Sequence, residues 1–133
     1  MNKACVKLRP GDSYQGKQGF SYFEGIARET VDAQGLCMHI LRVPPGACAK
    51  AHQHDGHETA IYVLEGYAAM YWGPRLEYVM ETGPGDLVYI PAGVPHLPFN
   101  SGDVEAVAVI ARTDPHEQES VVLRPDLEGL AGS

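Results

Sequence analysis

Two segments carry the most informative pattern in this chain. They are residues 46–59, GACAKAHQHDGHET, and residues 85–100, GDLVYIPAGVPHLPFN. In the first segment, His52 and His54 are two positions apart. Because residues two apart on a β-strand point to the same face, these histidines present two imidazoles side by side. A short turn then carries Glu58 toward the next strand, where its carboxylate can complete a set of metal ligands. The first segment therefore predicts part of a metal site.

The second segment supplies a third histidine. The predicted strand Leu87–Ile90 ends at Pro91 and Gly93, and this turn directs His96 back inward. A third histidine directed inward strengthens the prediction of a metal site. Neutral imidazole suits Zn, Fe, Ni, Cu and, with help from a carboxylate, Mn. The sequence therefore predicts one divalent transition metal ion and does not distinguish among these metals.

Together, the two segments resemble the paired motifs of the cupin superfamily. The second motif of the family, G-x5-P-x-G-x2-H-x3-N, is matched at every defined position. The first, G-x5-H-x-H-x(3,4)-E-x6-G, is matched except that seven residues separate the acidic residue from the last glycine. The resemblance implies an all-β fold, a double-stranded β-helix (the cupin or jelly-roll barrel), with the metal inside and open coordination positions facing the mouth. The matching residues are Gly46, His52, His54, Glu58 and Gly66, then Gly85, Pro91, Gly93, His96 and Asn100.

The extra residue in the first motif leaves the fourth ligand open. Counting back from Gly66 places the acidic position of the family on Thr59, a poor ligand, whereas counting forward from His54 places it on Glu58. A one-residue bulge would turn Glu58 inward. Without a bulge, regular alternation turns His57 inward and Glu58 outward. We predict the ligand set His52, His54, Glu58 and His96, with His57 as the alternative ligand.

Turn residues divide the rest of the chain into short strands. Its 15 glycines and 10 prolines separate runs rich in β-branched and aromatic residues, with turn signals about every 8 to 12 residues, which is typical of a sandwich or barrel. A length of 133 residues predicts one domain, residues 1–133, with a barrel core over about residues 20–123 and flexible ends. The predicted strands are Phe20–Ile26, Leu36–Val43, Ala60–Leu64, Tyr67–Trp72, Leu76–Glu81, Leu87–Ile90 and Val104–Ala111.

Two classes of function fit the resemblance. The first is a metal-dependent enzyme acting on a small molecule, as a dioxygenase, isomerase, lyase or cyclase. The second is a non-catalytic cupin that binds or senses a small molecule. We favour the enzyme because open metal positions within an aromatic-rich pocket are the usual form of a reactive site. For the substrate pocket we predict Lys50, which shares strand parity with the histidine pair, together with Tyr62, Trp72 and Phe99.

Charge and composition limit the partners. There are 17 acidic and 10 basic residues, and a net charge of −7 argues against binding nucleic acid or an anionic membrane surface. No apolar run approaches the ~20 residues of a membrane span. The three cysteines lack C-x-x-C spacing and predict reduced thiols and a cytoplasmic location. Val104–Ala111 is apolar on both strand faces except at Glu105. Either a second subunit or the N-terminal segment of the chain itself would cover the second face, and of the two we predict the homodimer.

Overall fold

Two antiparallel sheets form the protein. The computed structural model describes residues 4–9, 13–15, 21–116 and 121–132. Within these residues, the chain forms eleven strands, one short α-helix and one 3-10 helix, η1, close to the C-terminus. The elements are β1 (Ser13–Gln15), β2 (Ser21–Ile26), α1 (Arg28–Val31), β3 (Cys37–Val43), β4 (His52–His54), β5 (Thr59–Glu65), β6 (Ala68–Trp72), β7 (Tyr78–Thr82), β8 (Leu87–Ile90), β9 (His96–Phe99), β10 (Ala106–Arg112), β11 (Val121–Leu123) and η1 (Pro125–Leu130).

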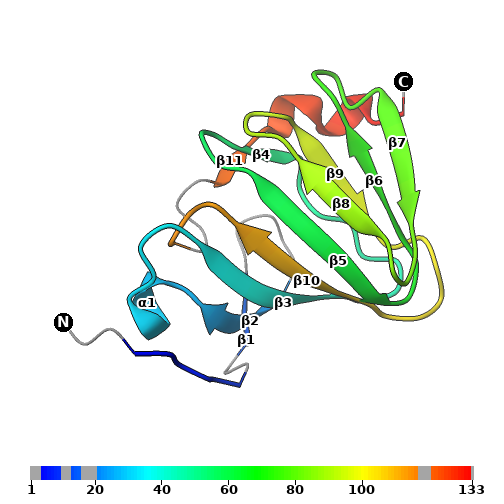
Figure 1. Ribbon diagram of the computed structural model, residues 1–133. Helices are drawn as coiled ribbons and strands as arrows, with labels where there is room; N and C mark the ends of the chain where they lie inside the picture. Colours follow the sequence, from blue (N-terminus) through cyan, green and yellow to red (C-terminus); the bar gives the residue numbers. More distant parts are fainter. Residues whose placement is uncertain (1–3, 10–12, 16–20, 117–120, 133) are drawn as a thin grey trace.

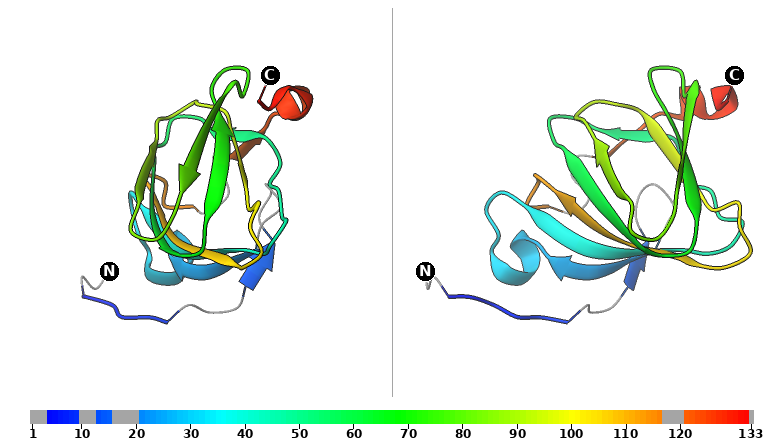
Figure 2. Two further views of the ribbon diagram at one scale, coloured as in Figure 1. Left: turned by 90° about the vertical axis from the view of Figure 1, so that its right-hand side faces the viewer. Right: turned by 45° about the vertical axis from the view of Figure 1, so that its right-hand side comes forward.

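The sheets face each other as the two walls of a barrel (Figures 1 and 2). One sheet has six strands in the order β1-β2-β3-β10-β5-β8, and the other has five in the order β11-β4-β9-β6-β7. The two histidine segments enter the smaller sheet as β4 and β9, which are neighbours there although far apart in the sequence. An all-β barrel agrees with the sequence prediction.

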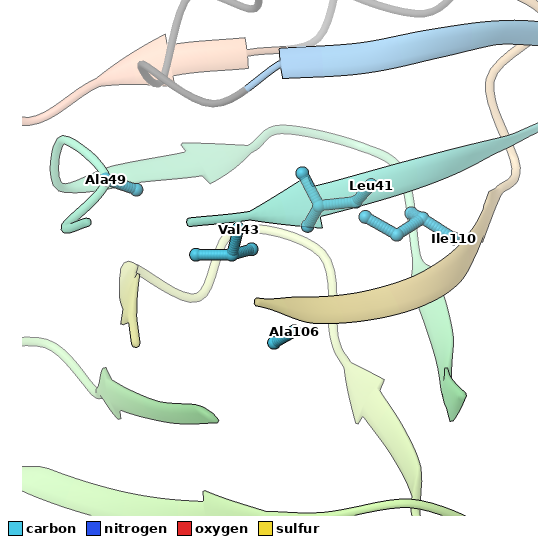
Figure 3. Close-up of a cluster of buried hydrophobic side chains, with 5 residues drawn as sticks. All are labelled: Leu41, Val43, Ala49, Ala106 and Ile110. Carbon is cyan, nitrogen blue, oxygen red and sulfur yellow. The ribbon is translucent and has the colours of Figure 1, made fainter. Parts of the chain in front are cut away.

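Strand alternation places the core between the sheets. In β3, Leu41 and Val43 point inward and are buried, whereas Arg42 between them is exposed. They pack with Ala106 and Ile110 of the neighbouring β10 and with Ala49 (Figure 3). Each fully buried Leu, Val or Ile side chain contributes roughly 1.5–3 kcal/mol to folding. Leu41, Val43, Ala106 and Ile110 belong to the larger sheet and line the cavity inside the barrel.

Motif residues outside the histidines hold the loops at one end of the barrel. The amide of Gly46 donates to the carbonyl of Asn100 at 2.9 Å, and the amide of Asn100 donates to Ala47 at 2.8 Å. The buried side-chain amide of Asn100 also donates to the carbonyls of Val43 and Val104, at 3.0 and 2.8 Å. The first residue of one motif is thereby joined to the last residue of the other, which fixes β4 relative to β9.

The described C-terminal residues 121–132 pack against the barrel. Leu127 of η1 is buried and packs with Ala51, Leu76 and Leu97. The amide of Arg124 also donates to the carbonyl of Ala51 at 2.8 Å. Within the described residues, neither α1 nor η1 has the length and apolarity of a membrane-spanning helix.

The glycine after β5 is expected to be sensitive to substitution. Gly66 has φ +76°, and a Cβ atom there would lie 2.5 Å from the carbonyl oxygen of Glu105 and 2.7 Å from the Cα of Ala106. We expect Gly66→Ala to lower the free energy of unfolding by roughly 3 kcal/mol, from the left-handed backbone and the overlap together. Gly46→Ala is the control, because φ is +75° but nothing lies within 4 Å, and should cost about 1 kcal/mol. Urea unfolding of both metal-free variants tests this, and equal losses would rule out the overlap.

Candidate metal centre

Three buried histidines meet inside the barrel. His52 on β4 lies directly opposite His96 on β9, and His54 follows two residues later on the same face of β4. Residues directly opposite on paired strands have neighbouring side chains, and so do residues two apart on one strand. The ring centroids of His52 and His96 are 4.2 Å apart, and those of His54 lie 5.3 and 5.5 Å from the other two. One ring nitrogen from each histidine lies within 4.8 Å of the others.

Backbone carbonyls orient two of the rings. Nδ1 of His52 lies 2.7 Å from the carbonyl oxygen of Lys50, and Nδ1 of His96 lies 2.9 Å from that of Val94. A carbonyl only accepts hydrogen bonds, so Nδ1 carries the proton and donates in both rings. The lone pair of each neutral ring is therefore on Nε2, which is the usual arrangement for a histidine that binds a metal.

Burial keeps the imidazoles neutral. Desolvation lowers the pKa of His96 to about 4, and it lowers the pKa of His52 and His54 well below their usual value of 6.5. The charge of Arg112 also lowers the pKa of all three rings. Metals bind the unprotonated ring, so the three histidines are in the required state at neutral pH. The donor set fits one divalent transition metal ion.

Counting back from Gly66 along the first motif places the acidic ligand of the family at position 59. That position is a threonine in this chain, and its side chain faces the cavity. Thr59 is buried, and Arg112 lies directly across from it on β10. Nε of Arg112 donates to the Thr59 hydroxyl at 3.3 Å, and the Arg112 side chain is buried too. Among the described residues, only the three histidines have ligand atoms grouped closely enough for a metal site.

Neither residue predicted as the fourth ligand joins this group. The alternation of β5 is regular from Thr59 to Val63, so Glu58 points outward. The register shift of this strand lies farther along, where Val63 and Glu65 pair with Ala108 and Val107 of β10. There its carboxylate accepts a hydrogen bond from the hydroxyl of Tyr89 at 2.6 Å. His57 is half-buried, with Nδ1 3.8 Å from the Asp114 carboxylate. The predicted inward turn of Glu58 is thus corrected to an outward one, because the register shift of β5 lies beyond Val63 and does not change the face on which Glu58 lies.

The family model for the cupin domain matches residues 39–111, which include both histidine segments. The chain belongs to the cupin family. Its two sheets are those of the double-stranded β-helix predicted from the motifs, and its histidine cluster lies within the matched region of the cupin domain.

Known proteins similar to this cupin are longer. Auxin-binding protein ABP19b of Prunus persica is 26% identical over 87 residues, which are 64% of this chain and 42% of that protein. The oxalate decarboxylase of Lactobacillus farciminis, solved as a formate complex, has a TM-score of 0.71 and 20% identity over 84% of this chain and 33% of its own. The Bacillus subtilis oxalate decarboxylase, which has Mn(II) centres, has a TM-score of 0.69 and 21% identity, covering 87% and 30%. This cupin spans less than half of each of these proteins.

None of the four side chains predicted for the substrate pocket is among the described residues that line the barrel cavity. Lys50 is exposed and contributes only its backbone carbonyl to the site. Tyr62 is on the outer face of β5, because its neighbours Ile61 and Val63 take the inward positions. Trp72 lies opposite His96 on β6 and packs against the cluster of Met70, Val88 and Ile90 beside the cavity. Its ring is tilted against that of Tyr78, with centroids 4.6 Å apart. Phe99 stacks on Tyr71 at 5.1 Å, beside the cluster that holds η1.

The sequence reasoning missed Arg112, which this cupin places in the cavity beside the histidines. A signal for it exists, because Ala108, Ile110 and Arg112 share one strand parity. With Ile110 inward, a period of two also turns Arg112 inward. Charged residues at strand ends are commonly solvated, so the pattern alone does not separate the two cases.

Proposed function

We propose that this cupin is a metal-dependent enzyme acting on a small molecule in its barrel, as a dioxygenase, isomerase, lyase or cyclase. His52, His54 and His96 would hold one divalent transition metal ion. The observation that carries the proposal is the meeting of three buried, neutral imidazoles in the barrel cavity. Burying polar rings costs free energy, and a shared ion would offset that cost.

The groups around the ion would have different roles. A bound divalent metal supplies a Lewis acid that polarises an oxygen of its ligand. The carbonyls of Lys50 and Val94 keep the rings of His52 and His96 in the ligating tautomer. The apolar walls of the cavity exclude water from the reacting groups. Since no described carboxylate joins the histidines, the ion would keep its full double charge and favour an anionic oxygen ligand.

Turnover separates the enzyme from a binding or sensing cupin. Protein purified without chelator is divided, and the small molecule it carries is identified by mass spectrometry before and after aerobic incubation with Fe(II), Mn(II) or Zn(II). We expect metal-dependent conversion of that molecule in the wild type and none in His96→Ala, which loses a ligand. Unchanged recovery of the molecule with every metal would favour the binding class.

We also propose a homodimer formed through the outer face of the larger sheet. Leu87 lies beside Tyr62, which lies beside Val109, which lies beside Ile40, giving one apolar row across four strands. Leu87 is 81% exposed and Tyr62 is 43% exposed. A contiguous apolar row at the surface favours contact with another protein, and a second copy offers the same row.

The homodimer predicts a mass in solution twice that of one chain. We expect Leu87→Lys to give monomers, because it buries a charge at the interface. Val79→Lys is the control, since Val79 is exposed on β7 in the other sheet. Light scattering coupled to size exclusion measures both variants, and a monomeric wild type would contradict the proposal.

Cys5, Cys37 and Cys48, all within the described residues, form no disulfide, and a cytoplasmic location stays a prediction.

A further inference from the structure

The strand that carries two of the three histidines is held along its whole length by the C-terminal segment, residues 121–130, which comprises β11 and η1 (Figure 1). With β9, on its other side, β4 has one residue pair, His52 opposite His96. The carbonyl of His54 also accepts a hydrogen bond from the amide of Gly93 at 2.9 Å. Because β11 is the edge strand of the smaller sheet, β4 would lie at the edge without it.

The C-terminal segment also holds the residue that precedes His52. The amide of Ala51 donates to the carboxylate of Glu128 at 3.3 Å, and its carbonyl accepts from the amide of Arg124 at 2.8 Å. The carbonyl of Lys50, the next residue back, is the group that accepts from Nδ1 of His52 at 2.7 Å. The orientation of this ring therefore depends on backbone that the C-terminal segment fixes.

A polar network joins the same two elements on the opposite face of β4. Gln53 lies between the two histidines, and the strand period of two turns its side chain away from them. Nη1 of Arg124 donates to Oε1 of Gln53 at 2.7 Å, and Nε2 of Gln53 donates to Asp55 at 2.6 Å. Nε and Nη2 of Arg124 donate to the two carboxylate oxygens of Asp126 at 3.1 and 3.0 Å. We call these four side chains the brace.

The brace has the geometry of a support for the strand rather than of a separate surface ion pair. The two-point contact with Asp126 fixes the plane of the guanidinium, so its remaining donor is already directed at Gln53. Partly exposed ion pairs contribute little to overall stability. A metal site is more sensitive, because groups that orient its ligands without touching the ion change its affinity about 10–100-fold. The brace is therefore expected to affect the site more than the whole fold.

We propose that Arg124 and Gln53 are positioning residues for the metal site, and that the C-terminal segment controls how readily the site opens. The inference rests on the proposed metal site, because it concerns the strand that supplies two of its ligands. It goes further by assigning a role to a segment outside both histidine motifs. Local detachment of β11 would free β4 from its longer pairing, and both of its histidines would lose their fixed position relative to His96.

Zinc binding tests the positioning role. Arg124→Met and Gln53→Met each remove the contact between β4 and the C-terminal segment and keep an apolar stem of similar length. We expect each variant to bind Zn(II) about tenfold more weakly, and to release it about tenfold faster to an excess of chelator. Arg42→Met is the matched control, because Arg42 forms an exposed ion pair with Glu105 at 2.8 Å in the larger sheet, and its affinity should stay within about twofold of the wild type.

The double variant shows whether Arg124 and Gln53 act through one contact. Because either substitution alone already breaks the hydrogen bond between them, the two together should lose little more affinity than one. Losses that multiply in the double variant would overturn the shared role. Equal affinity in Arg124→Met and Arg42→Met would also overturn it. Should Arg124→Met fail to fold, Gln53→Met decides in its place.

Hydrogen exchange of the metal-free protein separates positioning from a general loss of stability. In Arg124→Met, the amides of β4 should exchange about tenfold faster, while those of β3 in the larger sheet keep their wild-type rate. A merely structural role would speed exchange in both strands. Faster exchange of β4 with unchanged zinc affinity would overturn the inference as well.

The zinc content of the wild type distinguishes the two proposals. Wild-type protein that holds no Zn(II) would contradict the proposed metal site, whatever the exchange of β4 shows. Wild-type protein that holds one ion per chain, together with an Arg124→Met variant of unchanged affinity and exchange, would leave the metal site standing and overturn only the role of the brace.

Discussion

Replacing His52 and His96 together with alanine is expected to remove bound metal from this cupin almost completely. The double variant leaves His54 alone, although all three rings are grouped in the wild type. Loss of a residue that only supports a ligand costs about 10–100-fold in metal affinity, so loss of two ligands should cost more than about a thousandfold. Elemental analysis of protein purified without chelator should find about one transition metal ion per chain in the wild type and almost none in the variant.

Two control variants make this result specific. Glu58→Gln and His57→Ala should keep the metal affinity within about twofold, because neither side chain reaches the histidines. Circular dichroism confirms that each variant is folded. Equal metal content in the wild type and the double histidine variant would contradict the site, and a tenfold loss in Glu58→Gln would show that its carboxylate is a ligand after all.

Metal affinity is expected to stay constant from about pH 7 to about pH 5. Protons compete with the metal only below the pKa of each ligand, and burial lowers that of His96 to about 4 and those of His52 and His54 in the same direction. A site of three exposed imidazoles with ordinary pKa values would lose metal affinity below about pH 6. The loss would be about tenfold for each ring and for each pH unit. Competition dialysis of Zn(II), corrected for the pH dependence of the chelator, measures this. A steep fall between about pH 7 and pH 5 would contradict it.

The stability of the metal-free protein, in contrast, should depend on pH over this range. In the unfolded chain the imidazoles take up protons near pH 6.5, whereas the buried ring of His96 does so only near 4. Between these values the unfolded state binds more protons, so the free energy of unfolding falls as the pH falls. The slope is about 1.4 kcal/mol per pH unit for one such ring. Dialysis at each pH is therefore limited to the range in which the protein is shown to be folded.

Much of the fold could be predicted because its signals are local. Leu87–Ile90 was predicted with its observed bounds, and Leu36–Val43 and Val104–Ala111 differ from β3 and β10 by one or two residues. The turn glycines and prolines fix these bounds through backbone geometry that depends on few neighbours. The three clustered histidines were predicted for the same reason, since strand parity and a turn suffice to direct them inward.

The rest of the site depended on which face each strand turns inward and how the strands pair. Tyr62 has the residue type of a binding pocket, yet the register of β5 turns it to the outer face of the sheet. The Glu58 prediction required a bulge, and a bulge is decided by the hydrogen bonds of the neighbouring strand. Such information is not contained in the spacing of residues along one strand.

Strand period and turn residues act over a few positions, so the residue pattern was enough to predict the strands and the inward imidazoles, and the motif resemblance implied the cupin barrel. That Thr59 rather than Glu58 faces the histidines, and that Arg112 enters the same cavity, became evident only in the folded arrangement of the strands. The physical reason is that both depend on pairing between β5 and β10, strands more than forty residues apart, where register selects the side chain that shares the low-dielectric interior with the site.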